Sequence, residues 1–187
     1  VGVTEKLAGK SPDVSGITFT GSYDVGMNLY YNHTNLKYVR PTILELGGKN
    51  PTIISRHADV EDAALGTVRS AFGLQGQKCS AASRVYIEEP LYDKVVQRMV
   101  ELTEKFAVGD PTERQVYLGP VINKKAYADY QSYITDLAAA GTILTGGKQL
   151  KGGIYDKGYF CAPTIVADVP RDHPLWKKEM FLPITMV

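Results

Sequence analysis

Short apolar runs rich in β-branched residues alternate with longer amphipathic stretches along most of the chain. The short runs predict strands, which we expect at residues 17–21, 38–48, 51–55, 83–89, 142–147 and 164–169. The amphipathic stretches predict helices, which we expect after residue 22 and at residues 59–74, 91–106 and 124–140. Such alternation favours an α/β fold, with a largely parallel sheet flanked by helices.

The clearest helical periodicity follows Pro90. Apolar residues recur there at spacings of 4, 4, 3 and 4, namely Leu91, Val95, Met99, Leu102 and Phe106. That spacing puts them on one face of a helix, which we interpret as a core-facing stripe. Ser22 suits the N-cap of the first helix, and Gly141 suits the end of the last one.

Composition excludes several classes of protein. The 187 residues include 21 basic and 20 acidic side chains, so the net charge of +1 gives no reason to expect a nucleic acid or an anionic membrane as partner. No apolar run approaches the roughly 20 residues that span a bilayer. Two cysteines do not make a disulfide framework, and we expect a reduced, cytoplasmic protein, with a Cys79–Cys161 bridge left open.

Both ends of the sequence look cut. The chain starts at Val1 with a segment that lacks a strand, and it finishes on the apolar run FLPITMV. We therefore expect an excised fragment of a longer protein, with a processed natural protein as the alternative.

Cys79 lies in the polar, glycine-containing stretch FGLQGQKCSAASR, at residues 72–84. A nucleophilic thiol needs access and cationic or N–H-rich surroundings, and Lys78 precedes this one. A helix beginning nearby would add N–H groups that favour a thiolate and could hold an oxyanion. Cys161, among aromatic and apolar residues, is predicted to be structural. An inert role for Cys79 stays open on these residues alone, because structural thiols outnumber catalytic ones.

Glu45 interrupts the apolar end of a predicted strand, in LELGGKN at residues 44–50. Two glycines follow it, and α/β enzymes place catalytic groups and ligands at such strand ends. The carboxylate is therefore a candidate general base, and a solvated or salt-bridged glutamate is the alternative. Gly21 and Ser22 open the first helix after a strand, where an anion such as a phosphate could bind.

Five segments together resemble the aldehyde dehydrogenase superfamily, and they occur in that family's order. They are FTGSYDVG (19–26), LELGGKNPTII (44–54), GQKCSAASRVYI (76–87), GYFCAPTIV (158–166) and EMFLP (179–183). The pair ELGGK and GQxC is the specific part of the match, whereas Leu182 stands where the family usually has glycine. The resemblance covers nearly the whole chain. It implies an aldehyde dehydrogenase-like catalytic domain, at residues 47–187, and the end of a Rossmann-like cofactor domain, at residues 1–46.

The resemblance also implies a reaction. Cys79 would attack an aldehyde, a hydride would pass from the thiohemiacetal to NAD, or to NADP, and Glu45 would activate the water that hydrolyses the thioester. For the cofactor, Gly21 and Ser22 match the turn that contacts the pyrophosphate, and Leu46 matches a residue near the nicotinamide. Glu179 matches the carboxylate that binds the ribose, and Phe181 matches the aromatic residue beside it. No metal ion is implied.

Serine directly after the cysteine resembles the 1-pyrroline-5-carboxylate (glutamate semialdehyde) dehydrogenases within the superfamily, where Ser80 would help to hold the substrate. We expect a homo-oligomer at full length. The alternatives are an aldehyde dehydrogenase with another substrate, a catalytically silent folding or assembly module, and a cofactor-free esterase-type activity of Cys79.

Overall fold

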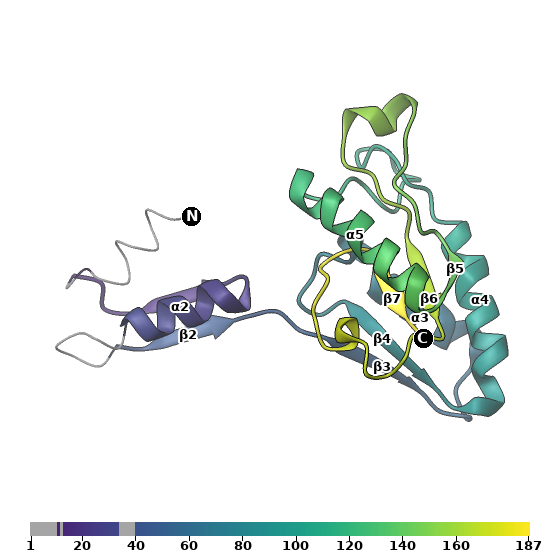
Figure 1. Cartoon of the computed structure of the whole chain (residues 1–187), viewed down its shortest axis with the longest axis horizontal. Helices are drawn as coiled ribbons and strands as arrows, with labels where there is room; N and C mark the ends of the chain where they lie inside the picture. Colours follow the sequence, from purple (N-terminus) through teal and green to yellow (C-terminus); the bar gives the residue numbers. More distant parts are fainter. Residues whose placement is uncertain (1–10, 12, 34–39) are drawn as a thin grey trace. The chain divides into compact units, whose positions relative to one another are not determined.

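The structure, a computed structural model, describes residues 11, 13–33 and 40–187, and the chain forms two compact units (Figure 1). Unit 1 comprises residues Val1–Gly47 and unit 2 comprises residues Gly48–Val187. The expected division into a cofactor-binding domain and a catalytic domain is a statement about function, and it stays a prediction.

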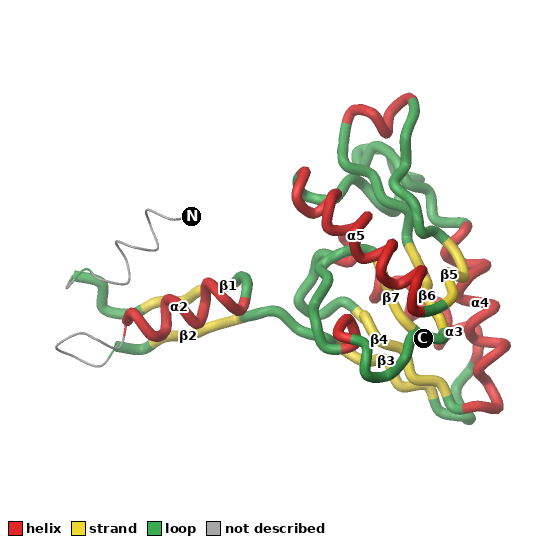
Figure 2. Tube along the Cα trace, viewed as in Figure 1, coloured by secondary structure: helices red, strands yellow, loops and turns green. Residues whose placement is uncertain are grey.

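Unit 1 contains a strand, a helix and a second strand. Strand β1 (Ile17–Thr20) pairs in parallel with β2 (Thr42–Glu45), and helix α2 (Tyr23–His33) lies between them in the sequence (Figure 2). Of the predicted strand at 38–48, residues 40–41 and 46–48 lie outside β2, and residues 38–39 lie outside the described part. Ser22 caps α2 as predicted, since its Oγ accepts a hydrogen bond of 3.4 Å from the Val25 amide.

Unit 2 is built on a five-stranded sheet in the order β3-β4-β7-β6-β5. The strands are β3 (Asn50–Ile54), β4 (Ala82–Ile87), β5 (Thr142–Thr145), β6 (Thr164–Ala167) and β7 (Ile184–Met186). All neighbouring pairs are parallel except β5 and β6, which are antiparallel. The expectation of a largely parallel sheet is confirmed for unit 2.

Strand β7 was not predicted. It lies between β4 and β6 in the sheet, and its three residues are buried. A central strand is covered on both faces, so it shows no alternation of polar and apolar residues. The apolar run FLPITMV, at residues 181–187, therefore contains an interior strand of the sheet.

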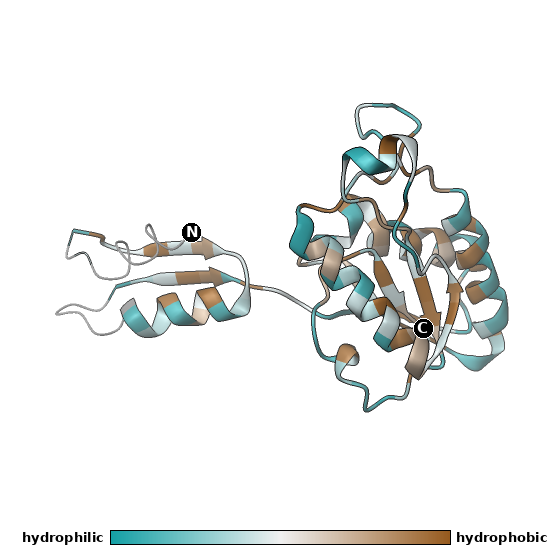
Figure 3. Cartoon of the chain, turned by 45° about the horizontal axis from the view of Figure 1, so that its top comes forward, coloured by the Kyte–Doolittle hydropathy of each residue, from teal (hydrophilic) through white to brown (hydrophobic). Residues whose placement is uncertain are grey.

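Two apolar clusters cover the two faces of the sheet. One contains helices α3 (Val60–Phe72) and α4 (Tyr92–Glu104), with Phe72, Val95 and Met99 fully buried. The other contains helix α5 (Lys124–Ala140) and the segment before β7, with Tyr130, Leu137 and Trp176. Figure 3 shows apolar strands enclosed by helices whose outer faces are polar. The predicted core stripe of α4 and the stop of α5 at Gly141 are confirmed.

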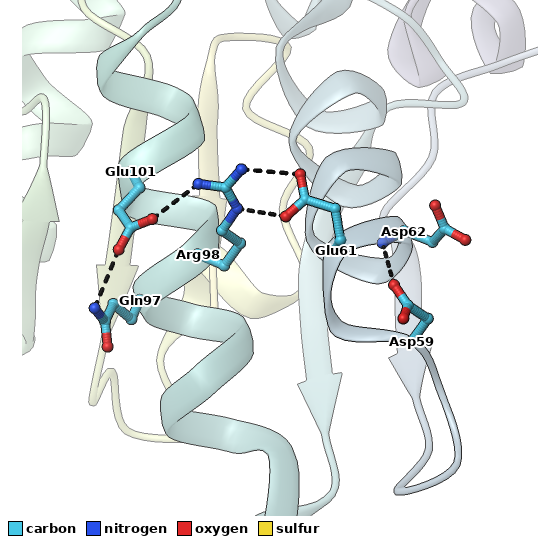
Figure 4. A network of polar contacts seen from close by, with 6 residues as sticks. All are labelled: Asp59, Glu61, Asp62, Gln97, Arg98 and Glu101. Carbon is cyan, nitrogen blue, oxygen red and sulfur yellow. Dashed lines mark hydrogen bonds and ion pairs between the residues drawn. The ribbon is translucent and has the colours of Figure 1, made fainter.

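Helices α3 and α4 are also joined on their outer side (Figure 4). The Arg98 guanidinium on α4 forms a two-bond ion pair with the Glu61 carboxylate on α3, at 2.5 and 2.9 Å, and also reaches Glu101 at 2.8 Å. These hydrogen bonds lower the pKa of Glu61 and of Glu101. Asp59 caps α3 by accepting a hydrogen bond of 2.9 Å from the Asp62 amide, as the sequence predicts for the start of this helix.

Candidate active site

The Cys79 thiol lies on a turn between α3 and β4. The turn closes with a hydrogen bond of 3.1 Å from the Ala81 amide to the Lys78 carbonyl, and the side chain of Cys79 is exposed. No helix begins at this turn: α3 has already ended at Phe72, and a strand follows. The condition under which a helix N-terminus would stabilise the thiolate is therefore not met.

The approach to the turn takes an unusual backbone path. Leu74 and Gln75 both have left-handed conformations, with φ of 52° and 58°, although neither is glycine. Gly76 also has a positive φ, of 66°, and a Cβ added there would lie 2.3 Å from the Leu182 carbonyl oxygen. Only glycine permits that approach, which brings the Cys79 turn next to the segment that contains Glu179.

Glu179 and Phe181 lie on that segment. The Glu179 Oε1 atom accepts a hydrogen bond of 3.1 Å from the Gly48 amide. Phe181 has a φ of 56° and is 44% exposed, whereas its neighbours Met180 and Leu182 are buried in the core. A left-handed aromatic residue is a strained conformation of the kind that gathers at binding sites. Leu182, the departure from the family pattern, is buried, and Glu179 lies beside Gly48.

A small cavity joins the two segments. Its lining includes Gly48, Lys78, Ala81, Glu179 and Phe181. Residues that the sequence separates by about 100 positions thus line one space. Ser80, the candidate substrate contact, is exposed directly after Cys79 on the same turn.

Three polar residues of this region were not singled out from the sequence: Lys49, Asn50 and Arg84. The Asn50 Nδ2 atom donates to the Cys79 carbonyl at 2.6 Å and to the Ala81 carbonyl at 3.2 Å. The Arg84 Nη2 atom donates to the Lys49 carbonyl at 2.5 Å. Lys49 and Asn50 are the last two residues of the ELGGKN motif, and their place in that motif is the sequence feature that could have identified them.

The ammonium group of Lys49 is enclosed, and its Nζ atom makes no hydrogen bond to any residue that the structure describes. Burial, and secondarily the positive charge of Arg84, lower the pKa of Lys49 from 10.5 to about 8, against an opposing effect of the Glu179 carboxylate. The Lys49 ammonium is therefore influenced by one neighbouring cation, Arg84, and one carboxylate, Glu179.

The remaining candidates lie in unit 1, at the carboxyl ends of its two strands. The Gly21 amide donates to the Glu45 carbonyl at 3.0 Å, so Gly21, the expected cofactor contact, and Glu45, the candidate base, are neighbours in the backbone. Leu46 packs on α2, where a Cβ on Gly26 would lie 2.3 Å from its Cδ2 atom. Glu45 and Leu46 belong to unit 1 and Cys79 belongs to unit 2, so the approach of the base to the nucleophile stays a prediction.

Cys161 is confirmed as a buried residue. Both cysteines are free, so the bridge left open by the sequence is not formed. Burial raises the pKa of the Cys161 thiol to about 12, which makes it a poor nucleophile at neutral pH. Among the residues that the structure describes, no group of acidic, histidine and cysteine side chains could hold a metal ion. None of the described helices is long and apolar enough to cross a membrane.

Comparison with known sequences gives one family and a consistent group of relatives. Residues 2–187 match the model of the aldehyde dehydrogenase family. The chain is 42% identical over 177 residues to the 1-pyrroline-5-carboxylate dehydrogenase of Bacillus cytotoxicus, and 41% identical to 1-pyrroline-5-carboxylate dehydrogenase 2 of Halalkalibacterium halodurans. Each alignment covers 92% of this chain and 34% of the relative. The chain thus spans about a third of the length of these relatives.

Solved structures agree with this assignment. A 1-pyrroline-5-carboxylate dehydrogenase from Thermus with bound NAD is 36% identical, with a TM-score of 0.87, over 97% of this chain and 35% of that one. An NAD-dependent aldehyde dehydrogenase from Sinorhizobium meliloti is 29% identical, with a TM-score of 0.92, over 99% and 36% of the two chains. The expected fold class is confirmed by these neighbours.

Proposed function

The chain belongs to the aldehyde dehydrogenase family, and from this premise we propose that it carries the nucleophile of an NAD(P)-dependent oxidation of an aldehyde to a carboxylate. One observation carries the proposal. The free thiol of Cys79 is exposed, on a turn whose residues Lys78 and Ala81 line a small cavity together with Glu179. Cys161, the other thiol, is buried and is not a candidate.

The proposed chemistry divides one oxidation into three steps. The Cys79 sulfur attacks the aldehyde carbon, and the product is a thiohemiacetal. NAD(P)+, when bound, supplies the acceptor for the hydride that leaves this carbon, so that a thioester remains. Glu45 takes a proton from water, the oxygen of that water attacks the thioester carbon, and the Cys79 thiolate leaves as the carboxylate product forms.

The residues present fit a dinucleotide. Glu179 is a carboxylate whose position is fixed by the Gly48 amide, and it could accept hydrogen bonds from ribose hydroxyls. Phe181 is exposed beside it and offers an apolar surface. In unit 1, Gly21 and Ser22 stand at the N-terminus of α2, where free amides favour a pyrophosphate. We assign these residues, with Leu46, to the cofactor.

L-glutamate semialdehyde, the open form of 1-pyrroline-5-carboxylate, is the substrate that we propose, with glutamate as the product of this step of proline catabolism. Sequence identity supports this choice, because the relatives at 41–42% are named 1-pyrroline-5-carboxylate dehydrogenases. The fold does not discriminate, since aldehyde dehydrogenases with other names reach TM-scores of 0.91 and 0.92. Ser80 is the proposed substrate contact. A cytoplasmic location and a homo-oligomer at natural length belong to the same proposal.

Substitution of the two proposed catalytic residues tests the function in the protein at its natural length. Cys79→Ser should abolish oxidation, whereas Cys161→Ala, which removes the other thiol, should leave turnover largely intact. Glu45→Gln should lower kcat by roughly 10²–10⁴-fold, because it removes a general base, but should preserve the first turnover of NADH formation. Steady-state turnover by Cys79→Ser would contradict the proposal. A panel of aldehydes, with NAD+ and NADP+ compared, would identify the substrate and cofactor.

A further inference from the structure

Residues Gly48–Asn50 form a junction between the two segments that line the small cavity. The Gly48 amide holds the Glu179 carboxylate at 3.1 Å. A Cβ on Gly48 would lie 2.8 Å from the Cys79 carbonyl oxygen, so a side chain at this position would push against the Cys79 turn. Two site segments thus meet at one short stretch of backbone.

Asn50 makes the direct connection to the Cys79 turn. Its carboxamide nitrogen has two hydrogens, and both find acceptors, at the Cys79 and Ala81 carbonyl oxygens. Because both partners are carbonyls, they require the nitrogen rather than the oxygen of the carboxamide to face them. One side chain therefore spans the turn on both sides of Ser80.

The backbone that carries Asn50 is itself fixed. The Arg84 guanidinium on β4 donates to the Lys49 carbonyl at 2.5 Å. Asn50 opens β3 opposite Ala82 of β4, and the register shifts between Asn50 and Pro51. From this irregular position the Asn50 side chain reaches the turn just before β4.

The turn needs such a support because its residues are poorly anchored by packing. Cys79 and Ser80 are exposed, and the segment that leads to them contains the left-handed pair Leu74 and Gln75. Catalysis by a nucleophile requires the attacking atom within a few tenths of an ångström of its productive position.

We propose that Asn50 is a positioning residue for Cys79, and that its carboxamide fixes the turn on which the thiol attacks the aldehyde. This inference rests on the proposed function for its consequence in catalysis. Its structural part concerns only the order of the turn, so the two can be tested separately.

The test compares Asn50→Ala and Asn50→Asp with Asn123→Ala in the protein at its natural length. Asn123 is a matched control, because its side chain also holds a backbone group, the Ala126 amide at the start of α5, and it neither lines the cavity nor bonds to the Cys79 turn. Asn50→Asp keeps the size of the side chain but replaces the donor with a carboxylate that faces two carbonyls. If one Asn50 variant fails to fold, the other carries the test.

Two readouts are expected to change in the Asn50 variants and not in the control. Loss of two hydrogen bonds should speed amide deuterium exchange in the peptide that contains Cys79 by roughly tenfold or more. With glutamate semialdehyde, kcat should fall by up to roughly 100-fold, while KM for NAD+ changes little.

Unchanged exchange in both Asn50 variants would overturn the proposal. Faster exchange with an unchanged kcat, in an active wild-type enzyme, would also overturn it, because the turn would then not need Asn50 for chemistry. If the wild type oxidises no aldehyde, the proposed function fails, and the exchange experiment alone still decides whether Asn50 orders the turn.

Discussion

Replacement of Lys49 by methionine should raise the free energy of unfolding at pH 7. The enclosed ammonium has a pKa of about 8 in the folded protein, against the ordinary lysine value of 10.5. At about 1.4 kcal/mol per pH unit, this difference corresponds to a destabilisation of roughly 3 kcal/mol, as an upper limit, which methionine would remove. Methionine is similar in length and fills the same space without a charge.

The sign of the pH dependence follows from the same pKa values. Below pH 8 both the folded and the unfolded chain carry the proton, so the cost of burying the charge is fully present. Between pH 8 and 10.5 the unfolded chain binds more protons than the folded one, so this residue makes the wild type more stable as pH rises. The advantage of Lys49→Met should therefore shrink across that window.

Urea denaturation followed by circular dichroism, at pH 7 and at intervals up to pH 10.5, measures this difference. Lys151→Met, at an exposed lysine in the loop before β6, controls for the loss of a charge. The reasoning is refuted if Lys49→Met is less stable than the wild type at pH 7, or if its advantage does not depend on pH.

Three further predictions concern other parts of unit 2. Leu74 is 66% exposed and has a φ of 52°, a left-handed conformation that asparagine adopts more readily than leucine. Leu74→Asn should therefore stabilise the protein by about 1 kcal/mol in the same urea assay, and a loss of stability would contradict backbone strain at this residue. Glu61→Gln should lower the thermal midpoint at neutral pH, and its deficit should vanish as pH falls through the lowered pKa of Glu61, where the carboxylate that pairs with Arg98 is lost in the wild type. A deficit that persists at acid pH would contradict the ion-pair explanation. Iodoacetamide should label Cys79 much faster than Cys161, as followed by mass spectrometry of the peptides, and comparable rates would contradict the burial of the second thiol.

The elements that the sequence predicts well are those whose signals are local. The stripe from Leu91 to Phe106 and the caps at Asp59 and Gly141 report on a helix through neighbouring residues. Strand β7 has no such signal, because its three buried residues lack alternation and its partners lie far away in the sequence.

The site shows the same limit. The motifs identify Cys79 and Glu179, but they do not show what holds each of them. Asn50 reaches the Cys79 turn because β3 pairs with β4 after the chain has passed through α3, and no local pattern contains that contact. The left-handed conformation of Leu74 lies two residues before the close approach of Gly76 to Leu182, and the residue type of Leu74 gives no hint of it.

The most direct test of Cys79 as the nucleophile is the mass of the peptide that contains this residue after a single turnover. Glu45→Gln protein at natural length, mixed with NAD+ and glutamate semialdehyde and quenched in acid, should carry the acyl group on Cys79, because hydrolysis of the thioester is slowed. The peptide that contains Cys161 should keep its original mass. NADH formation without any acyl group on Cys79 would contradict the assignment of this thiol as the nucleophile.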